Sequence, residues 1–125
     1  MILGLGIDFL ETSRVERELA QGEWLLEDGI FTPEEILYCS STDQPARRFA
    51  ACFAAKEAAL KALGIRVTDL AMFREVEVGP GAGGGPEIWL RQRPKTESEQ
   101  LGVRRIRLAI AQNANHTGAT VILED

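Results

Sequence analysis

The sequence is poor in cysteine, in long apolar runs and in positive charge, and each shortage excludes a class of protein. Its 125 residues include two cysteines, Cys39 and Cys52, which are too few for a disulfide framework and lack the spacing of a zinc site. We therefore expect free thiols and a reducing, cytoplasmic setting. No stretch approaches the roughly 18 apolar residues of a membrane span, and the apolar N-terminus is too short for a signal peptide. No membrane role is expected.

Positive charge is scarce as well, with 14 Lys and Arg against 19 Asp and Glu and a net charge of −5. This balance argues against general nucleic-acid binding. Two local pairs of arginines remain, Arg14 with Arg17 and Arg47 with Arg48, and either pair offers a small basic surface to an acidic partner. Ordinary solvated surface explains each of these arginines equally simply.

Apolar residues, in contrast, make up 45% of the chain. That share is enough to build a core without disulfides or a structural metal. A length of 125 residues suits one domain. Neither a repeat nor a linker divides the sequence, so we expect a single domain over residues 1–125.

The first part of the chain predicts a strand and then a helix. Residues 2–8 alternate apolar side chains with glycines and end on Asp8, which is typical of a short buried strand. Ser13 and Glu16 have the spacing of a capping box, so a helix is predicted to begin there. Arg14 then lies in the first turn of that helix, close behind Asp8.

Two further helices are predicted next. A second capping box at residues 32–35, with Pro33 at the first helical position, predicts a short helix that ends near residue 38 or 39. The longest helix is expected from about residue 43 to residue 63, with Gly64 as its C-terminal stop.

Two charged residues interrupt the apolar stripe of the long helix, which is formed by Phe49, Phe53, Leu60 and Leu63. Lys56 lies within this stripe and Glu57 at its margin, where a charge is costly unless it is paired or used. Lys61 follows Glu57 by four residues and would form an ordinary helix pair with it. Lys56 could likewise extend its ammonium group to water. The pattern alone leaves a structural and a functional explanation open.

The pattern after Gly64 is mostly that of strands. Residues 75–78 and 87–90 predict a hairpin. The glycine-rich segment 79–85 between them lacks the lysine and the Ser/Thr of a P-loop and has no helix after it, so it is expected to be a loop tip. A short helix over residues 96–101 and strands over residues 106–110 and 119–123 complete the chain. The order β-α-α-α-β-β-α-β-β indicates an α+β fold, with the long helix packed on a largely antiparallel sheet.

Three segments together carry a family resemblance. Gly6-Ile7-Asp8 ends the first strand, Phe53-Ala54-Ala55-Lys56-Glu57-Ala58 lies in the long helix, and Glu75-Val76-Glu77-Val78 begins the hairpin. In order and spacing, nearly the whole chain resembles the small, single-domain holo-acyl-carrier-protein synthases of the 4′-phosphopantetheinyl transferase superfamily. The resemblance implies the fold of that superfamily. It also implies transfer of 4′-phosphopantetheine from coenzyme A to a serine of an apo acyl carrier protein, with release of adenosine 3′,5′-bisphosphate.

The resemblance further implies the residues of the site. Asp8 and Glu57 would be the ligands of Mg²⁺, an ion that is often held by one or two carboxylates together with water and phosphate oxygens. The ion would neutralise charge on the pyrophosphate during transfer. Lys61 and Lys56 would contact phosphate as point charges. Glu57, or a water on the metal, would accept the proton of the serine.

Outside this centre, the resemblance implies that Gly64, Arg47 and Gln112 contribute to coenzyme A binding. Arg14 would meet the acidic recognition helix of the carrier protein, with Arg47 as a further residue for that role. Family members of this size are homotrimers with active sites at the subunit interfaces, so we expect a homotrimer with shared sites.

Several positions depart from the family pattern. Cys52 stands where an arginine is usual, Ile65 follows Gly64 in place of a Thr-Gly turn, and Gln112 lies in a stretch that is usually rich in Ser and Thr. His116, the only histidine, lies outside the family motif. These departures leave a second hypothesis open, a catalytically weakened homologue that binds coenzyme A or a carrier protein. A third hypothesis is a plain α+β protein in which Lys56 and Glu57 are structural.

Overall fold

The computed structural model describes residues 1–26 and 29–125, and within them the chain forms five strands, four α-helices and two 3₁₀ helices. In chain order these are β1 (Ile2–Glu11), α1 (Thr12–Gln21), η1 (Glu23–Leu25), α2 (Pro33–Ser40), α3 (Pro45–Ala62), η2 (Leu70–Glu75), β2 (Val76–Pro80), β3 (Pro86–Leu90), α4 (Gln92–Leu101), β4 (Arg105–Gln112) and β5 (His116–Glu124). Apart from the two 3₁₀ helices, this is the predicted order, and the predicted α+β class is confirmed.

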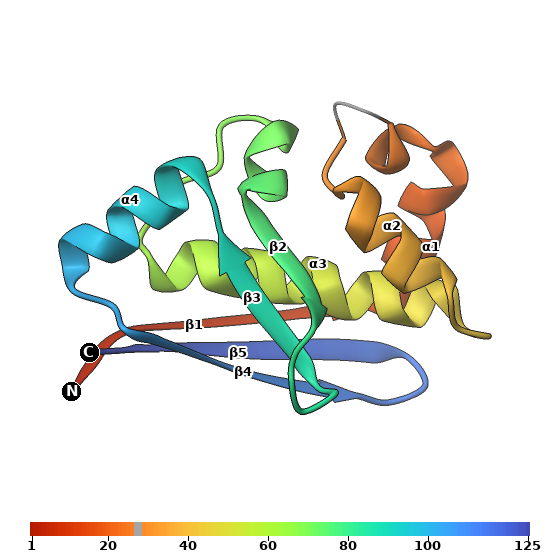
Figure 1. The fold of residues 1–125 in the computed structure, drawn as a ribbon. Helices are drawn as coiled ribbons and strands as arrows, with labels where there is room; N and C mark the ends of the chain where they lie inside the picture. The colour runs from red at the N-terminus through yellow and green to blue at the C-terminus, as the bar shows by residue number, and fades with distance from the viewer. Residues whose placement is uncertain (27–28) are drawn as a thin grey trace.

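The elements are arranged in layers around α3 (Figure 1). On one side of α3 lies an antiparallel sheet of three strands in the order β1-β5-β4, with β5 in the middle. On the other side lie the β2–β3 hairpin and α2, both of which contact α3. The two termini lie side by side at one end of the sheet, where the N-terminal ammonium group is 2.7 Å from Asp125 Oδ1.

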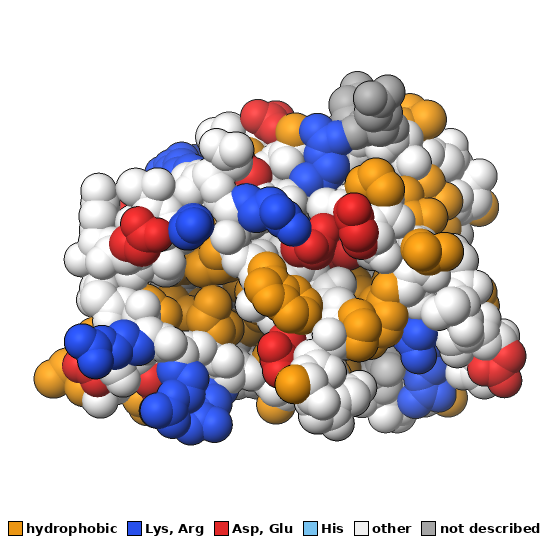
Figure 2. Space-filling model, viewed as in Figure 1, with side chains coloured by type: hydrophobic (Ala, Val, Ile, Leu, Met, Phe, Trp, Pro, Cys, Tyr) orange, Lys and Arg blue, Asp and Glu red, His pale blue; other side chains and the backbone are white. Residues whose placement is uncertain are grey.

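The surface carries charges of both signs. On the face seen in Figure 2, acidic and basic side chains are interspersed, with hydrophobic side chains gathered between them. None of the helices in the described part of the chain combines the length and the apolar character needed to cross a membrane.

The capping box predicted for α2 is present. Glu35 N donates to Thr32 Oγ1 over 3.1 Å, and Thr32 N donates to Glu35 Oε1 over 2.9 Å. This reciprocal pair satisfies two backbone donors at the start of the helix. With Pro33 in the first turn, it explains why a helix of eight residues begins where the sequence predicts.

The capping box predicted at Ser13 is wrong. Helix α1 begins one residue earlier, at Thr12, and its N-cap residue, Glu11, makes no capping bond through its side chain. Thr12 is held instead by the sheet: its N–H donates to Asn115 O over 2.9 Å, and its Oγ1 lies 3.1 Å from Thr117 Oγ1. Contacts of Thr12 with Asn115 and Thr117, which are distant in the sequence, therefore fix the start of α1 in place of a local motif.

Helix α4 and strand β5 both begin earlier than predicted. Helix α4 starts at Gln92, with the buried Pro94 in its first turn, where the missing N–H of proline costs no helical hydrogen bond. Strand β5 starts at His116 because its first residues pair with the end of β1, His116 opposite Glu11 and Thr117 opposite Leu10. The hairpin and the glycine-rich tip between its strands lie where the sequence predicts.

Strand β1 lies unusually close to α3 because two of its residues are glycines. A Cβ atom on Gly6 would collide with the backbone of Ala58 and Ala62, and one on Gly4 would collide with the carbonyl of Ala62. Strand and helix can therefore pack backbone against backbone. This close packing brings Asp8, two residues after Gly6, against the side of the long helix.

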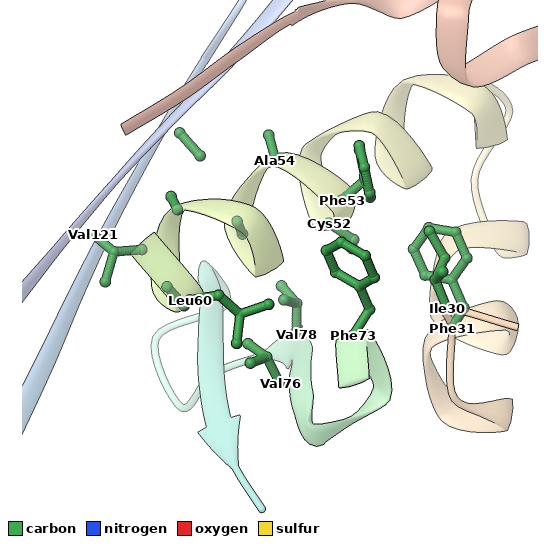
Figure 3. Packing of buried hydrophobic residues seen from close by; sticks show 14 of the residues in the cluster. Ile30, Phe31, Cys52, Phe53, Ala54, Leu60, Phe73, Val76, Val78 and Val121 are labelled. Carbon is green, nitrogen blue, oxygen red and sulfur yellow. The ribbon is translucent and has the colours of Figure 1, made fainter. Parts of the chain in front are cut away.

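The aromatic core packs on the side of α3 that faces away from the three-stranded sheet (Figure 3). The ring of Phe53 lies 4.5 Å from that of Trp24 and 5.5 Å from that of Phe73, measured between centroids. The ring of Phe31 lies 4.9 Å from that of Phe49. The predicted apolar stripe of α3 is confirmed, since each of its members is buried: Phe49, Phe53, Leu60 and Leu63.

Lys56 lies at the centre of the fold and does not extend to water. Its side chain is fully buried, and its Nζ is 2.7 Å from Glu35 Oε1. The ammonium group also donates to the carbonyl oxygens of Phe73 and Val76, over 2.8 and 2.6 Å. The other carboxylate oxygen of Glu35 accepts from Val78 N over 2.8 Å. All three donors of Lys56 are thus used inside the protein.

Burial disfavours the charged forms of both Glu35 and Lys56. Burial raises the pKa of Glu35, against the opposing effect of the Lys56 ammonium group. Burial likewise lowers the pKa of Lys56, against the opposing effect of the Glu35 carboxylate. Each partner therefore compensates the desolvation of the other, and neither is tolerated alone.

We predict that Lys56→Met lowers the free energy of unfolding by about 3–5 kcal/mol, because it leaves the Glu35 carboxylate buried without its cation. Urea denaturation followed by circular dichroism measures the loss. The matched control is Lys95→Met on the exposed side of α4, with an expected change of about 0.5 kcal/mol or less. The double variant Lys56→Met with Glu35→Leu should recover part of the loss. Equal stability of Lys56→Met and Lys95→Met would contradict the assignment.

Candidate active site

The carboxylate of Asp8 is buried at the contact between β1 and α3. The Lys61 ammonium group, from α3, donates to Asp8 Oδ1 and to the carbonyl oxygen of Ile7, each over 3.1 Å. The second oxygen, Asp8 Oδ2, is buried, and no group in the described part of the chain hydrogen-bonds to it. Because a buried carboxylate oxygen is costly to leave unsatisfied, this atom indicates a place for a ligand.

Glu57 brings a second carboxyl group to the same place. Its side chain is half-buried on α3, and its pKa is raised to about 7, mainly by burial and then by the neighbouring Asp8 carboxyl group. Lys61 and Arg14 oppose this shift through their positive charges. Two carboxylates held close together repel each other, so a proton or a cation beside them relieves the repulsion.

Arg14 lies at the rim of the site. Its guanidinium carbon is 5.7 Å from the centroid of the Phe53 ring, and Phe53 precedes Glu57 by one turn of α3. The Arg14 side chain is otherwise exposed. The site therefore combines two carboxyl groups at its base with two cationic side chains, of which Lys61 contacts Asp8 and Arg14 is open to solvent.

The donor set fits a hard divalent cation. Within residues 1–26 and 29–125, no group of three or more His, Cys, Asp or Glu side chains is placed to hold a metal ion. A metal at this site would therefore rely on Asp8 and Glu57, completed by water and substrate oxygens, which is a common mode of binding for Mg²⁺. The unsatisfied Asp8 Oδ2 supplies one ligand atom without any rearrangement of protein hydrogen bonds.

Lys56 does not belong to this site, and its predicted contact with phosphate is wrong. Consecutive residues of a helix point about 100° apart, so Lys56 faces the hairpin while Glu57 faces β1. The ammonium group of Lys56 is surrounded by Glu35 and two backbone carbonyls and has no donor left for a ligand. Lys61 also does not form the predicted helix pair with Glu57, because its ammonium group bonds to Asp8 instead.

Arg47 and Gln112 lie in a different place, on the wall of a cavity of about 330 Å³ at the N-terminal half of α3. Gln112 Nε2 donates to Arg47 O over 2.9 Å and to Thr117 Oγ1 over 3.0 Å. Both amide protons are therefore used, which contradicts a role for Gln112 as a donor to phosphate. Arg47 precedes Glu57 by ten residues, about 15 Å along the helix.

Gly64 is exposed in the turn that ends α3, with φ of +71°, where a residue with a side chain would be strained. Its N–H donates to Lys61 O over 3.1 Å, so the turn lies beside the lysine of the site. The structure thus brings together Asp8, Glu57 and Lys61, with Arg14 at the rim. It leaves Arg47 apart from them.

Two features of the cavity were not predicted from the sequence, the presence of Tyr38 and the role of Arg48. The guanidinium of Arg48 stacks on the Tyr38 ring at 4.5 Å and donates to Tyr38 O over 2.9 Å. Both side chains line the cavity with Arg47. The adjacent arginines were the only hint of this cavity in the sequence. The sequence does not indicate which of the two contacts Tyr38.

Comparisons with known proteins match the chain over nearly its whole length. A family model for the 4′-phosphopantetheinyl transferase superfamily matches residues 4–114. A holo-[acyl-carrier-protein] synthase of Geobacter sp. (strain M21) is 41% identical over 124 residues, which cover 99% of each chain.

Solved structures give the same result. The crystal structure of a holo-[acyl-carrier-protein] synthase from Neisseria meningitidis has a TM-score of 0.85 and 30% identity over the full length of both chains. A holo-(acyl-carrier-protein) synthase from Bacillus anthracis, in complex with CoA (3′,5′-ADP), has a TM-score of 0.75 and 26% identity over 98% of this chain and 96% of that one. The likeness therefore includes every segment that builds the site.

We predict that Glu57→Gln changes the dependence of stability on pH. Since the pKa of Glu57 is about 7 in the folded protein, against an ordinary value of 4.5, this group contributes stability that is fully present below pH 4.5 and is lost as the pH rises through 7. The variant should therefore melt higher than the original chain at pH 8, by a few degrees, where about 1 kcal/mol corresponds to roughly 4 °C.

Thermal unfolding between pH 5 and pH 8 in buffer with EDTA measures this difference, since chelation removes any divalent cation. The control is Glu99→Gln on the exposed surface of α4. A difference between Glu57→Gln and the original chain that stays constant over this pH range would overturn the assignment of the raised pKa.

Proposed function

The chain belongs to the 4′-phosphopantetheinyl transferase superfamily, and we propose that it transfers 4′-phosphopantetheine from coenzyme A to a serine hydroxyl of an apo acyl carrier protein. The products are the holo carrier protein and adenosine 3′,5′-bisphosphate. The observation that carries the proposal is the pairing of Asp8, whose buried Oδ2 has no partner among the described residues, with Glu57 beside Lys61. The full-length relatives of the chain are holo-acyl-carrier-protein synthases. The relative in complex with CoA (3′,5′-ADP) supports coenzyme A as the donor.

In this proposal Asp8 and Glu57 hold Mg²⁺. When bound, the ion neutralises negative charge on the pyrophosphate of coenzyme A. Glu57 must lose its proton for the ion to bind, and its pKa of about 7 makes this loss easy at neutral pH. Binding of Mg²⁺ is therefore expected to release a proton and to strengthen as the pH rises through 7.

Lys61 binds the phosphate side of the donor. Two of its three ammonium protons are used by Asp8 and Ile7, which hold the group at the edge of the acidic pair. The third is free to donate to a phosphate oxygen, as an ammonium group commonly does. Glu57, or a water on the metal, accepts the proton of the attacking serine.

Arg14 guides the carrier protein. It is an exposed cation at the rim of the site, in a chain with a net charge of −5. Attraction of an acidic carrier therefore depends on a local patch and not on the total charge. Arg14 meets this need because its guanidinium group lies over Phe53, one helical turn from Glu57.

A homotrimer with shared sites completes the proposal. On the outer face of the sheet, three alternate residues of the edge strand β1 expose large apolar side chains: Leu5 at 59%, Ile7 at 58% and Phe9 at 69%. Such a row marks an interaction surface. Contact between chains through this face would allow Arg47 of one chain to serve the acidic centre of another, since about 15 Å of helix separates Arg47 from Glu57 within one chain.

The two free cysteines fit a protein that works in the reducing cytoplasm.

Transfer is tested by incubating the protein with an apo carrier protein, coenzyme A and Mg²⁺ and measuring the mass of the carrier. We predict a gain of one phosphopantetheine group, loss of the reaction with EDTA, and recovery on addition of Mg²⁺. Asp8→Asn and Glu57→Gln should lower the rate by on the order of 100-fold or more, because each removes charge stabilisation made in the transition state.

The control for this experiment is Glu99→Gln, an exposed carboxylate far along the chain, with an unchanged rate. Calorimetric titration with coenzyme A separates the outcomes. Binding of coenzyme A without any mass change in the carrier would show that the protein is a binding module and not a transferase.

The oligomer is tested with Phe9→Asp, which places a charge in the exposed apolar row of β1. We predict three times the mass of one chain for the original protein and a lower mass for the variant, because burial of a charge without a partner opposes association. Sedimentation velocity at micromolar concentration measures both. Leu37→Asp, on the exposed side of α2, is the control with an unchanged mass. A monomeric original chain, or a variant that still forms trimers, would reject this surface as the interface.

A further inference from the structure

The two cysteines of the chain lie against each other in the core. Cys39 of α2 and Cys52 of α3 are separated by 13 positions in the sequence, and their sulfur atoms are 3.5 Å apart. Both thiols are free and buried, with exposed fractions of 0% and 2%. Neither takes part in the proposed transfer reaction. The pair is therefore a reactive element that the transfer reaction does not use.

Contacts on both sides hold the two thiols together. One helical turn from each cysteine, Glu35 of α2 is bonded to Lys56 of α3 over 2.7 Å. At the C-terminal end of α2, Arg48 of α3 donates to Tyr38 O over 2.9 Å and stacks on the Tyr38 ring. The sulfur atoms form the middle of three successive contacts between the two helices. Their approach is thus fixed by neighbours that do not depend on the cysteines.

The two sulfur atoms differ in their access to small molecules. Cys52 lines the cavity of about 330 Å³ together with Tyr38, Ala51 and Arg48, whereas Cys39 is not among the residues that line it. Figure 3 shows Cys52 on α3 within the packed core. A small neutral reagent in the cavity therefore meets Cys52 first, and Cys39 stands directly behind it.

We propose that Cys39 and Cys52 form a reversible oxidation site, which closes to an intramolecular disulfide by exchange with a low-molecular-weight disulfide that enters the cavity. In the first step the Cys52 sulfur attacks one sulfur of the reagent R–S–S–R, giving Cys52–S–S–R and one R–SH. In the second step the Cys39 sulfur attacks the Cys52 sulfur and releases the second R–SH. The two protein thiols are oxidised by two electrons, the reagent disulfide is reduced, and both thiol protons leave on the two R–SH molecules.

The environment of Cys39 assigns it to the second step. Its hydrogen bond with Cys52, and then its burial, raise the pKa of the Cys39 thiol. Because thiolates are the attacking species, such a thiol does not react directly with a reagent in solution. Once Cys52 has formed the mixed disulfide, Cys39 attacks over a short, fixed distance.

Closure clamps α2 to α3. A disulfide places its sulfur atoms about 2.0 Å apart, against 3.5 Å between the two thiols. The two sulfur atoms must therefore move toward each other. This clamp goes beyond the transfer reaction and is measured on the protein alone, so its failure and that of the proposed function are distinguishable.

The test uses the whole folded protein with bis(2-hydroxyethyl) disulfide as the reagent, followed by acid quenching and mass spectrometry. We expect the original chain to lose two hydrogen atoms in mass, to lose both reactive thiols, and to yield a peptide cross-linked between Cys39 and Cys52. Dithiothreitol should restore the starting mass. Hydrogen exchange of the backbone amides in residues 33–44 should be slower in the cross-linked protein by severalfold, since α2 can then open only together with α3.

Two single variants separate this mechanism from simple reactivity of buried thiols. Cys39→Ala should stop at the mixed disulfide on Cys52, because no second thiol displaces the reagent. Cys52→Ala should leave Cys39 reduced for as long as the protein stays folded. The proposal is overturned if the original chain also stops at the mixed disulfide. It is equally overturned if the folded chain is inert under conditions that cross-link it in urea.

Discussion

The buried bond between Glu35 and Lys56 is the constraint on which the rest of this fold depends. It joins four elements at once, because Glu35 lies on α2, Lys56 lies on α3, and their remaining groups bond to the backbone of Phe73 in η2 and of Val76 and Val78 in β2. Such a pair adds little to stability when compared with apolar side chains of the same shape, but it is intolerant of partial substitution. Its main effect here is orientation. With Lys56 fixed toward the hairpin, α3 has one allowed rotation about its axis.

That rotation determines the electrostatics of the acidic pair on the adjacent face of the helix. Glu57 follows Lys56 directly and is turned toward β1, where Gly4 and Gly6 allow a backbone-to-backbone approach. The two carboxyl groups of Asp8 and Glu57 are thereby held together, and the pKa of Glu57 is raised, first by burial and then by the neighbouring Asp8 carboxyl group. An isolated strand and helix would relieve this repulsion by moving apart. Here the close packing and the buried ion pair oppose that movement, so a cation or a proton must relieve it.

The sequence predicts the local parts of this arrangement and fails where a distant partner decides. The α2 capping box and the extent of α3 were predictable, since their signals lie within a few residues of each other. Ser13 failed as a cap because Thr12 is bonded to Thr117, more than 100 residues away. The family resemblance placed Lys56 in the site. The helical pattern put it within the apolar stripe but could not identify Glu35 as the group opposite it. The family resemblance predicted that Asp8 and Glu57 share a site. Helical periodicity alone left a structural explanation open for Glu57.

Cys52 is another residue whose role depends on a partner that the sequence does not reveal. Taken alone, a cysteine at a position where the family usually has an arginine suggests the loss of a contact with phosphate. In the folded chain, however, Cys52 has a partner in Cys39, and the cavity beside it keeps two arginines, Arg47 and Arg48, from the preceding turn of α3. Positive charge therefore remains on the cavity wall while a thiol pair occupies the layer behind it. A substitution that looks like a defect in the sequence is, in three dimensions, one half of a matched pair, and only the contact between α2 and α3 reveals it.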